Sequence, residues 1–494
     1  MTNENKKQGK YKDIAKSTGM VGMIQIFQMG FGLLRNKLVA ILLGTGGFGI
    51  WSLYQTFITM TSSFSSLGLD QSGVREIAKH SNDEFSVGKC IWVFRRAILL
   101  ISLIVSLFII IFAENISIYL FNSSDYKWGI RFISIIIFGE AYAKGGYAVL
   151  NGLRQLNILA KSQILSYIFG SISAILLIFI FKEDGIPIAL GMVTFTLAVI
   201  TWIYIRKLKI REYLPQRKEA INIFKPLLTL GLGFTIAGIT AAFFTLCSRM
   251  YLNTHYDINA VGIYQASWTI ANLYIGVILS AMGVDFMPRL SKTKSDREMT
   301  TMVQDQLDFS MLLASIGVSG ILIFTPFILQ LLYSSEFLPG SSIIRWHVLG
   351  VGMRVLAFPF SYVIMAKGKA LLYAITQIIF WGGEFCLLIL FSSLFGFDGL
   401  GVNYCIGYMG YLIMTCIASR FLCGFKFSKQ NFKIISITWG FIALAWFCSY
   451  FFSGATRYFI GTGILLLHAF IIHWCFKKYL SINILSFLKR LIKK

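Results

Sequence analysis

Long apolar segments recur along almost the whole of this 494-residue chain. Each is close to or above the ~20 residues that an α-helix needs to cross about 30 Å of hydrocarbon. Inside a bilayer the backbone must satisfy its own hydrogen bonds, so such segments are restricted to helices. The sequence therefore predicts an all-α integral membrane protein. We place about fourteen membrane helices near residues 17–43, 46–69, 91–112, 128–150, 159–181, 186–205, 226–252, 260–285, 309–332, 343–365, 371–394, 399–421, 434–453 and 456–476.

The composition supports this prediction. Hydrophobic residues make up 56% of the chain and charged residues only 14%. A soluble domain of that composition would expose an apolar surface and aggregate. The first apolar segment is also too long for the core of a cleavable signal peptide, so we expect it to be a membrane helix.

The second half of the chain repeats the first about 214 residues further on. Asp184-Gly185-Ile186 returns as Asp398-Gly399-Leu400. Further matches pair 160–164 with 374–378, 67–70 with 282–285, and 49–51 with 262–264. A near-constant offset indicates an internal duplication, which in a membrane protein is typical of transporters. We expect two pseudo-symmetric six-helix lobes followed by two extra C-terminal helices.

The duplication and the polar connections suggest where the chain divides. The expected parts are a cytoplasmic tail (1–16), an N-lobe (17–205), a basic cytoplasmic linker (206–225), a C-lobe (226–421), two further helices (434–476) and a basic cytoplasmic tail (477–494).

The net charge of +23 is distributed unevenly. If both termini are cytoplasmic, the inner tails and loops hold 35 of the 45 Lys and Arg residues, and the outer loops hold only Lys127, Lys182 and Arg457. This is the bias of the positive-inside rule, with basic loops facing anionic lipid of the inner leaflet. The charge therefore predicts contact with membrane lipids and no binding of nucleic acid.

Motifs for cofactors and enzymes are weak. Gly44–Gly49 (Gly-Thr-Gly-Gly-Phe-Gly) matches a dinucleotide fingerprint, but it falls in an expected turn between two membrane helices instead of after a strand. His468 and His473 do not form a convincing metal pair, and the eight cysteines have no metal-site or disulfide spacing. The longest outer connection, 113–127, is short for holding a glycan acceptor. We predict no cofactor, no metal and no enzymatic activity.

Charged residues within the predicted helices are the candidate functional groups. Each costs about 2.5–3.5 kcal/mol at mid-bilayer, so such residues usually face a cavity or a partner. The 214-residue offset pairs Arg35 with Arg249 and Arg131 with Arg345, and it pairs Glu140 with Arg354, a reversal of charge. The full set is Arg35, Lys37, Arg131, Glu140, Lys144, Arg249, Arg345, Arg354 and Glu384.

Buried arginines favour an anionic substrate, because a guanidinium keeps its charge and offers forked donors to phosphate oxygens. We predict that Arg35, Arg249, Arg354 and Lys144 bind substrate. For Arg249 and Arg35 a cavity position competes with an ordinary position near the outer helix ends. Lys144 lies four residues after Glu140, so an intrahelical ion pair is the alternative.

Other charges have simpler explanations. Arg131 and Arg345 lie within a turn of the outer ends of their helices and are expected to extend to the membrane interface. Arg345 and Arg354 are nine residues apart, about 900° around a straight helix, so they face opposite sides. Glu140 and Glu384 are candidates for gating or ion coupling, but a hydrogen bond from Glu384 to a neighbouring helix explains it equally well.

Several short runs carry a family resemblance. They are Leu33–Lys37, Leu42–Gly44, Gly47–Gly49, Leu67–Leu69, Arg75–Ala78, Val261–Tyr264 and Pro288–Ser291. Together they resemble polysaccharide flippases of the Wzx type, members of the multidrug/oligosaccharidyl-lipid/polysaccharide (MOP) superfamily, which also holds MATE drug exporters and lipid II flippases. The resemblance extends over the whole chain. Thr45 departs from it, because the family often has proline there, and we expect only a local change in that turn.

The resemblance implies a function. The substrate would be an oligosaccharide on a polyprenyl diphosphate, such as an O-antigen repeat unit, turned from the cytoplasmic to the outer leaflet of the bacterial cytoplasmic (inner) membrane by alternating access. Other glycan-assembly membrane proteins are potential partners. At the inner helix ends Asp70 and Asp285, beside Arg75 and Arg289, would form salt bridges that close the cytoplasmic side, with loop capping as the alternative.

Two other functions remain open at this point. A cation-coupled drug antiporter would require Glu384 or Glu140, and a membrane glycosyltransferase or polymerase would require catalytic groups on an outer loop. The driving force is also open. A diphosphate would be driven outward by the membrane potential at about 2.3 kcal/mol per charge per 100 mV, and proton or sodium antiport is the alternative.

Overall fold

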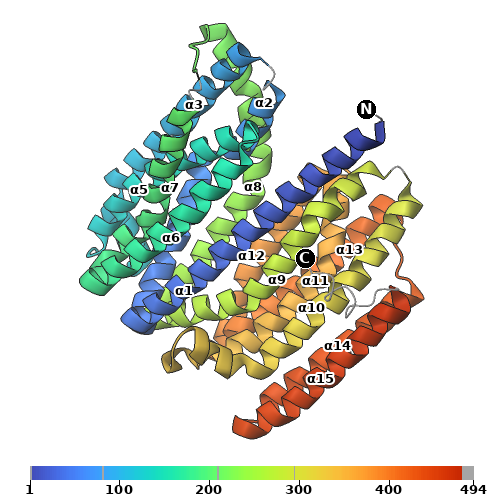
Figure 1. The fold of residues 1–494 in the computed structure, drawn as a ribbon. Coiled ribbons are helices and arrows are strands. Elements are labelled where there is room, and N and C mark those ends of the chain that lie inside the picture. The colour runs from blue at the N-terminus through green and yellow to red at the C-terminus, as the bar shows by residue number, and fades with distance from the viewer. Residues whose placement is uncertain (1–2, 81–82, 209–210, 294, 481–494) are drawn as a thin grey trace. The chain divides into compact units, whose positions relative to one another are not determined.

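The computed structural model describes residues 3–80, 83–208, 211–293 and 295–480, and every regular element in that part of the chain is helical. Two compact units are defined by their internal contacts, residues 1–262 and residues 263–494. Each is a bundle of long helices (Figure 1). The expected tail 477–494 falls largely outside the described residues, as do positions 209–210 of the expected linker.

Unit 1 is built around the long helix α1, against which α3, α5, α6 and α8 pack. Its helices are α1 (Asn3–Ser66), α2 (Leu69–Lys79), α3 (Glu84–Ile111), α4 (Ala113–Phe121), α5 (Lys127–Gly152), α6 (Leu156–Phe181), η1 (Lys182–Gly185), α7 (Ile186–Lys207), α8 (Arg217–His255) and the first residues of α9 (Ile258–Lys292).

Unit 2 is centred on α11, which packs most extensively against α13 and α10. Its last two helices run beside each other and against α10 (red in Figure 1). Besides α9, the helices are α10 (Asp296–Leu332), η2 (Ser335–Phe337), α11 (Gly340–Ala366), α12 (Ala370–Phe395), η3 (Gly396–Gly401), α13 (Val402–Cys423), α14 (Lys429–Phe451) and α15 (Gly454–Tyr479).

The prediction of fourteen membrane helices is confirmed. Among the described residues, eleven helical stretches are long and apolar enough to cross a membrane. Three of them consist of two helices in succession: α1 on either side of a break, α6 with α7, and α12 with α13. The chain is therefore a multi-pass membrane protein of the all-α class.

Two short helices lie outside the predicted set. The helix α2 follows the second membrane segment, and α4 occupies the outer connection that we expected to be a loop. Several membrane helices are also longer than predicted: α8 begins at Arg217 and α10 at Asp296, ahead of the expected 226 and 309. A window of apolar residues marks only the part of a helix that lies in lipid. Polar extensions of the same helix into water are therefore not detected.

The duplication is visible in the backbone. Lys182 and Gly396, which are 214 residues apart, end α6 and α12 in nearly the same conformation, with positive φ of 53° and 59° and ψ of −131° and −140°. A second pair at the same offset, Arg154 and Gly368, has φ of 56° and 67°. Positive φ is uncommon outside glycine, so its recurrence at equivalent positions indicates a repeated chain path.

The repeats differ at one turn. Gly68 adopts a left-handed conformation between α1 and α2. Its equivalent at an offset of 215 is Gly283, which lies inside the continuous helix α9. The helix of the first repeat is therefore interrupted at this position, whereas the helix of the second repeat is continuous.

The glycine run that resembles a nucleotide motif is a turn between two membrane helices. Gly44 alone has non-helical dihedral angles within α1, with φ 66° and ψ −166°. Such a conformation is accessible to glycine at little cost. Because the run joins helix to helix, it lacks the strand that a dinucleotide site requires, as the sequence predicts.

Just after this turn, α1 crosses the beginning of α9 within unit 1. A Cβ atom on Gly49 would lie 2.0 Å from the carbonyl oxygen of Ile258, and one on Gly262 would lie 2.1 Å from that of Thr45. The Thr45 hydroxyl donates a hydrogen bond of 2.8 Å to Asn259 Oδ1, 214 residues further on. Gly49 and Gly262, which the repeat pairs, thus each lie against a carbonyl group of the other helix, and the crossing depends on glycine on both helices.

The polar ends of unit 1 are tied by charge. Lys89 Nζ on α3 donates to Glu219 on α8 at 2.8 Å. Glu219 also accepts from the backbone N–H of Gln216, completing a capping box at the start of α8. The hydrogen bond from Lys89 lowers the pKa of the Glu219 carboxyl.

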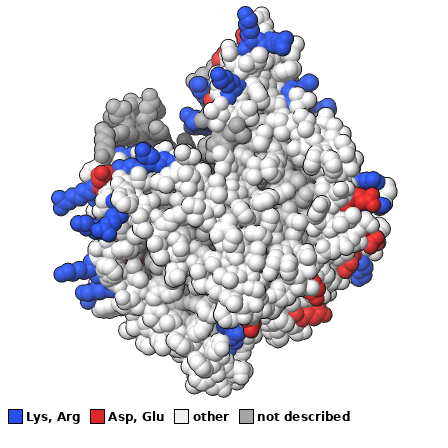
Figure 2. Space-filling view, turned by 180° about the vertical axis from the view of Figure 1, so that it is seen from behind, with Lys and Arg blue, Asp and Glu red and all other residues white. Residues whose placement is uncertain are grey.

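On the face drawn in Figure 2, charged side chains lie at the margins and the wide surface between them is uncharged.

A buried polar network joins α14 to α10 in unit 2. Asn431 caps the first turn of α14 together with Ser428. Its side-chain amide also donates to Asp308 Oδ1 at 2.6 Å and to the carbonyl oxygen of Gln304 at 3.1 Å. Gln430 donates to the second Asp308 oxygen at 2.9 Å. Asp308 is 2% exposed, so these donors satisfy a carboxyl group held away from water.

Replacing Asn431 with alanine is expected to destabilise the folded protein by about 2–4 kcal/mol. It removes a helix cap and leaves a buried oxygen of Asp308 without its closest donor. The measurement is the apparent Tm of the purified protein in detergent. The matched control, Lys433→Ala, removes an exposed side chain two residues further along α14 and should leave the Tm nearly unchanged. Equal Tm values for both variants would contradict the assignment.

Candidate functional site

The most connected of the predicted cations is Arg354, in the middle of α11. Its guanidinium donates to Asn272 Oδ1 on α9 at 2.8 Å. The same amide oxygen accepts the hydroxyl of Tyr404 on α13 at 2.7 Å. The guanidinium also lies 6.0 Å from the centre of the Tyr408 ring. Two neighbouring helices, α9 and α13, thus hold the arginine in place, and none of these contacts is to a carboxylate.

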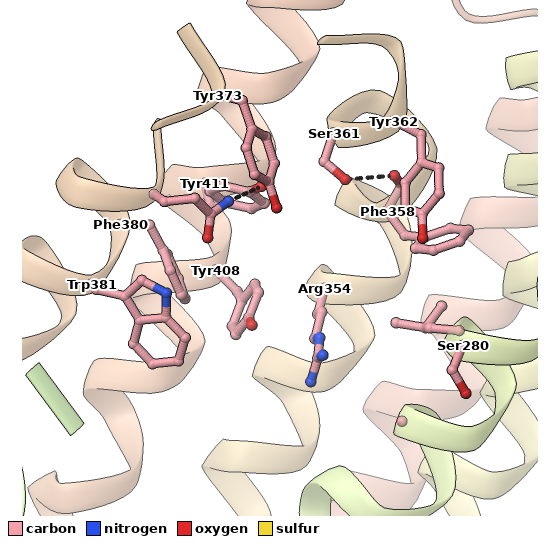
Figure 3. Close-up of a pocket in the computed structure, with 13 residues that line it drawn as sticks. Ser280, Arg354, Phe358, Ser361, Tyr362, Tyr373, Phe380, Trp381, Tyr408 and Tyr411 are labelled. Carbon is pink, nitrogen blue, oxygen red and sulfur yellow. Dashed lines mark hydrogen bonds between the residues drawn. The ribbon is translucent and has the colours of Figure 1, made fainter. Parts of the chain in front are cut away.

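Arg354 borders a cavity of about 340 Å³ within unit 2. In Figure 3 the arginine lies between Tyr408 and Ser280, with Tyr373, Tyr411, Phe380 and Trp381 grouped on the Tyr408 side. None of the lining residues is acidic. They are Gly276, Leu279, Ser280, Arg354, Phe358, Ser361, Tyr362, Tyr373, Gln377, Phe380, Trp381, Tyr408 and Tyr411.

The tyrosines of this cavity were not among the predicted site residues. Tyr408 and Tyr411 line the cavity, and Tyr404 lies four residues before Tyr408 on the same face of α13. That spacing is present in the sequence and could have drawn attention to this face. Aromatic residues at helical spacing usually pack in a core, however, and only the neighbouring arginine distinguishes this group.

Glu384 on α12 is 5% exposed and does not line the cavity. Its carboxylate accepts a hydrogen bond from Asn403 Nδ2 on α13. A carboxylate bound in this way to the next helix matches the structural alternative raised for Glu384. A role in gating or coupling remains a prediction.

In unit 1, Arg249 on α8 is 4% exposed. Its Nε donates to Ser52 Oγ on α1 at 3.0 Å, and its NH1 group donates to the carbonyl oxygen of Thr245 at 3.1 Å. The guanidinium is thus held against the second half of α1, and both of these contacts are to neutral oxygens.

Two more predicted cations contact the same half of α1. The Arg35 guanidinium lies 5.3 Å from the centre of the Trp51 ring, and its buried Nε has no hydrogen-bond partner among the described residues. Lys144 Nζ on α5 donates to Ser62 Oγ at 2.6 Å and lies 3.2 Å from Glu140 Oε1. The expected intrahelical ion pair therefore forms, and Lys144 reaches a serine on α1 as well.

The polar positions of α1 were missed by the sequence reasoning. Ser52 and Ser62 are ordinary serines in an apolar segment, and nothing in their spacing marks them. Serines and threonines in membrane helices usually satisfy themselves on their own backbone carbonyls. Through these contacts, three cations lie near residues 51–62 of α1, together with the acid Glu140. The cations are Arg35, Arg249 and Lys144.

The two inner-end carboxylates differ. Asp285 on α9 forms an ion pair of 2.8 Å with Arg289, and both side chains are exposed. Within the described residues no side-chain ion pair joins Asp70 to Arg75. An exposed pair four residues apart on one helix contributes little to stability. A gating role for Asp70 and Asp285 stays a prediction.

The two arginines expected at the interface make local contacts. The Arg131 guanidinium lies 4.6 Å from the centre of the Trp128 ring on its own helix, α5. Arg345 donates to the carbonyl oxygen of Ser449 at 3.0 Å, near the end of α14. Arg345 is therefore held by a neighbouring helix terminus, where a cation complements the helix dipole.

In the described part of the chain, no group of three or more His, Cys, Asp or Glu residues is placed to hold a metal ion. His468 is buried and stacks on the Phe441 ring at 4.6 Å between ring centres. The candidate groups are arginine, lysine and serine side chains in unit 1 and arginine, tyrosine and serine side chains in unit 2, and the cations among them suit binding of a polar anion.

Comparison with solved structures shows which fold the chain has. The lipid II flippase MurJ in an inward closed conformation matches 93% of this chain and 99% of its own, with a TM-score of 0.74 and 15% sequence identity. A MATE multidrug resistance transporter of the MOP superfamily, in an inward-facing conformation, matches 80% of this chain and 94% of its own, with a TM-score of 0.65 and 17% identity. The chain shares the fold of these two proteins.

Sequence comparison gives the family. The polysaccharide biosynthesis protein family matches residues 14–294, more than half of the chain, so the chain belongs to that family. The lipid III flippase of Escherichia coli (strain K12) is 24% identical over 418 residues, covering 82% of this chain and 97% of its own length. A putative O-antigen transporter of Shigella flexneri is 24% identical over 374 residues, covering 74% and 87%.

Proposed function

We propose that this protein is a flippase that carries a polyprenyl-diphosphate-linked oligosaccharide from the cytoplasmic to the outer leaflet. The observation that supports it most is family membership combined with relatives named as a lipid III flippase and a putative O-antigen transporter, each matched over most of its length. The substrate would be an O-antigen or similar surface polysaccharide repeat unit. Alternating access would carry its polar head across the membrane.

The charges in each unit suit the head group of such a lipid. A diphosphate carries about two negative charges and oxygens that match the forked donors of arginine. Arg354 donates to the neutral amide of Asn272, which also accepts the Tyr404 hydroxyl. An arginine held by neutral groups keeps an electrostatic attraction for an anionic head group. Arg249, which donates to Ser52, would add a second positive charge. Lys144, being paired with Glu140, would contribute less.

A cation-coupled drug antiporter is the second candidate function. The positions and partners of the carboxylates argue against it. Organic cations need an acidic partner, but none of the residues that line the cavity beside Arg354 is acidic. Glu384 is bound to Asn403, and Glu140 lies beside Lys144. A glycosyltransferase or polymerase is less consistent still, because the relatives are named as flippases and transporters.

Several finer points belong to the same proposal. We place the protein in the bacterial cytoplasmic membrane with both termini in the cytoplasm, because the basic loops then face anionic lipid. The repeat boundaries at 17–205 and 226–421 would be those of the two lobes, although α8 is part of compact unit 1. Other glycan-assembly membrane proteins would be partners.

The test is reconstitution. Purified protein in liposomes should move a fluorescent polyprenyl-diphosphate oligosaccharide between leaflets faster than protein-free liposomes. A potential that is negative on the side of the starting leaflet should accelerate this movement, since about two charges gain about 2.3 kcal/mol each per 100 mV. Failure to move any lipid-linked glycan, together with uptake of an organic cation, would favour the antiporter. If the movement depends on a proton or sodium gradient and not on the membrane potential, the flippase function stands and only the proposed driving force changes.

A further inference from the structure

The cavity beside Arg354 has a composition that neither a diphosphate nor a lipid tail explains. Seven of its lining residues are aromatic, and they come from three helices, α11, α12 and α13. Aromatic faces are apolar but carry a negative quadrupole, which attracts weakly positive C–H groups. A diphosphate has no such groups, so the aromatic walls require another ligand.

The polar groups between the aromatic rings offer hydrogen bonds of both kinds. Ser280 and Ser361 donate their protons to the carbonyl oxygens of Val277 and Phe358, which leaves the lone pairs of the serine oxygens as acceptors. Gln377 donates to the hydroxyl of Tyr411 at 2.9 Å (Figure 3). Arg354 adds a charged donor at the edge of the cavity. An apolar prenyl chain would leave these groups unsatisfied.

The size of the cavity limits what fits. A hexose occupies roughly 180 Å³, about six times the ~30 Å³ of a liquid water molecule. The cavity of about 340 Å³ is large enough for one such ring with its substituents and slightly smaller than two hexoses.

A pyranose ring combines the required properties. Its axial C–H groups form an apolar face that stacks on an aromatic ring, and its rim of hydroxyl groups both donates and accepts hydrogen bonds. An organic cation would also stack on aromatic faces, but Arg354 would repel it and no carboxylate among the lining residues would neutralise it.

We propose that the cavity lined by Arg354, Tyr408, Phe380, Trp381 and Gln377 binds a single sugar ring of the translocated glycan and so selects which glycan is accepted. This proposal rests on the proposed flippase function and adds to it. In this arrangement Arg354 contacts the diphosphate or an adjacent sugar oxygen at the edge of the cavity. The aromatic residues contact the sugar ring and determine which sugar is accepted. This selectivity for the sugar is separate from the general attraction of the cations for the lipid diphosphate.

The test compares lipids with and without sugar. Full-length protein in nanodiscs is titrated with bare polyprenyl diphosphate and with the same lipid carrying one glucose, N-acetylglucosamine, 6-deoxyhexose or glucuronic acid. We expect at least one of the four glycosylated lipids to bind five- to tenfold tighter than the bare lipid. Trp381→Ala should abolish that difference and leave the affinity for the bare lipid unchanged, and Trp381→Phe should retain most of it.

Two control variants separate the possible failures. Trp474→Ala removes a half-exposed tryptophan on α15 that does not line this cavity, and it should bind all lipids as the wild type does. Arg354→Ala should weaken binding of the bare lipid as well, because the diphosphate loses a cation.

The outcomes are distinguishable. Equal binding of bare and all four glycosylated lipids by the wild type overturns the sugar site but leaves the flippase function standing. Loss of bare-lipid binding in Trp381→Ala likewise overturns it, since the tryptophan would then support the fold or the lipid. No binding of any lipid, with tetraphenylphosphonium bound instead, would reject both proposals.

Discussion

Arg354→Ala is expected to reduce the amount of glycan at the cell surface at least tenfold at a matched protein level. The variant loses a buried cation and leaves Asn272 with only the Tyr404 hydroxyl among the contacts described for its amide oxygen. Arg354→Lys should recover only part of the activity, because an ammonium group keeps the charge but cannot form the same forked contacts. Tenfold corresponds to about 1.4 kcal/mol. The measurement is surface glycan in the native cell lacking its chromosomal copy of the gene.

The matched control lies on the same helix. Arg345 is nine residues away on α11 and contacts the carbonyl oxygen of Ser449 at the end of α14. Arg345→Ala should therefore lower the Tm of the purified protein more than it lowers surface glycan, whereas Arg354→Ala should do the opposite. If both variants lost glycan in proportion to lost protein, Arg354 would have a structural role alone. Arg35→Ala and Arg249→Ala should resemble Arg354→Ala.

Gly49→Ala is expected to have the second large effect. A methyl group at this position would lie 2.0 Å from the carbonyl oxygen of Ile258, and a backbone atom cannot move aside as a flexible side chain can. Overpacking of this kind costs about 1–3 kcal/mol and separates the two helices. We expect a lower apparent Tm and a strong loss of surface glycan, measured on the same preparation and in the same cells.

Gly139→Ala is the control, because a Cβ atom there would have no neighbour within 4 Å. Alanine also favours helix over glycine, so this variant should be as stable as the wild type or slightly more so. Gly262→Ala, at the equivalent position of the second repeat, should reproduce the effect of Gly49→Ala. A normal Tm and normal glycan in both variants would contradict the close crossing.

Most of the fold could be predicted from the sequence because the bilayer limits the possibilities so strongly. A segment of apolar residues long enough to cross lipid has to be a helix, and Gly44 identifies the turn between the first two. The short helix α2 was missed because it is amphipathic and partly exposed, so its pattern competes with those of ordinary loops. The polar extension of α10 from Asp296 was missed because hydropathy does not report on helices in water.

The site could be predicted only in part. Charge is costly in lipid, so the sequence could single out Arg354 and Arg249. Their partners Asn272, Ser52 and Tyr404 are neutral and carry no comparable signal, because their contribution depends on which helices are adjacent. Adjacency is set by packing between residues up to 197 positions apart along the chain, as for Arg249 and Ser52. Local periodicity contains no information at that range.

The paired approach at Gly49 and Gly262 has a consequence for the origin of the chain. Each glycine lies against the carbonyl oxygen of the residue four positions before its counterpart, Ile258 for Gly49 and Thr45 for Gly262. Such a reciprocal contact is isologous, as in a symmetric dimer of separate molecules. A single repeat could therefore have paired with a copy of itself through this crossing. Fusion of two copies would keep the crossing and allow the residues around it to differ, as Thr45 and Ile258 do.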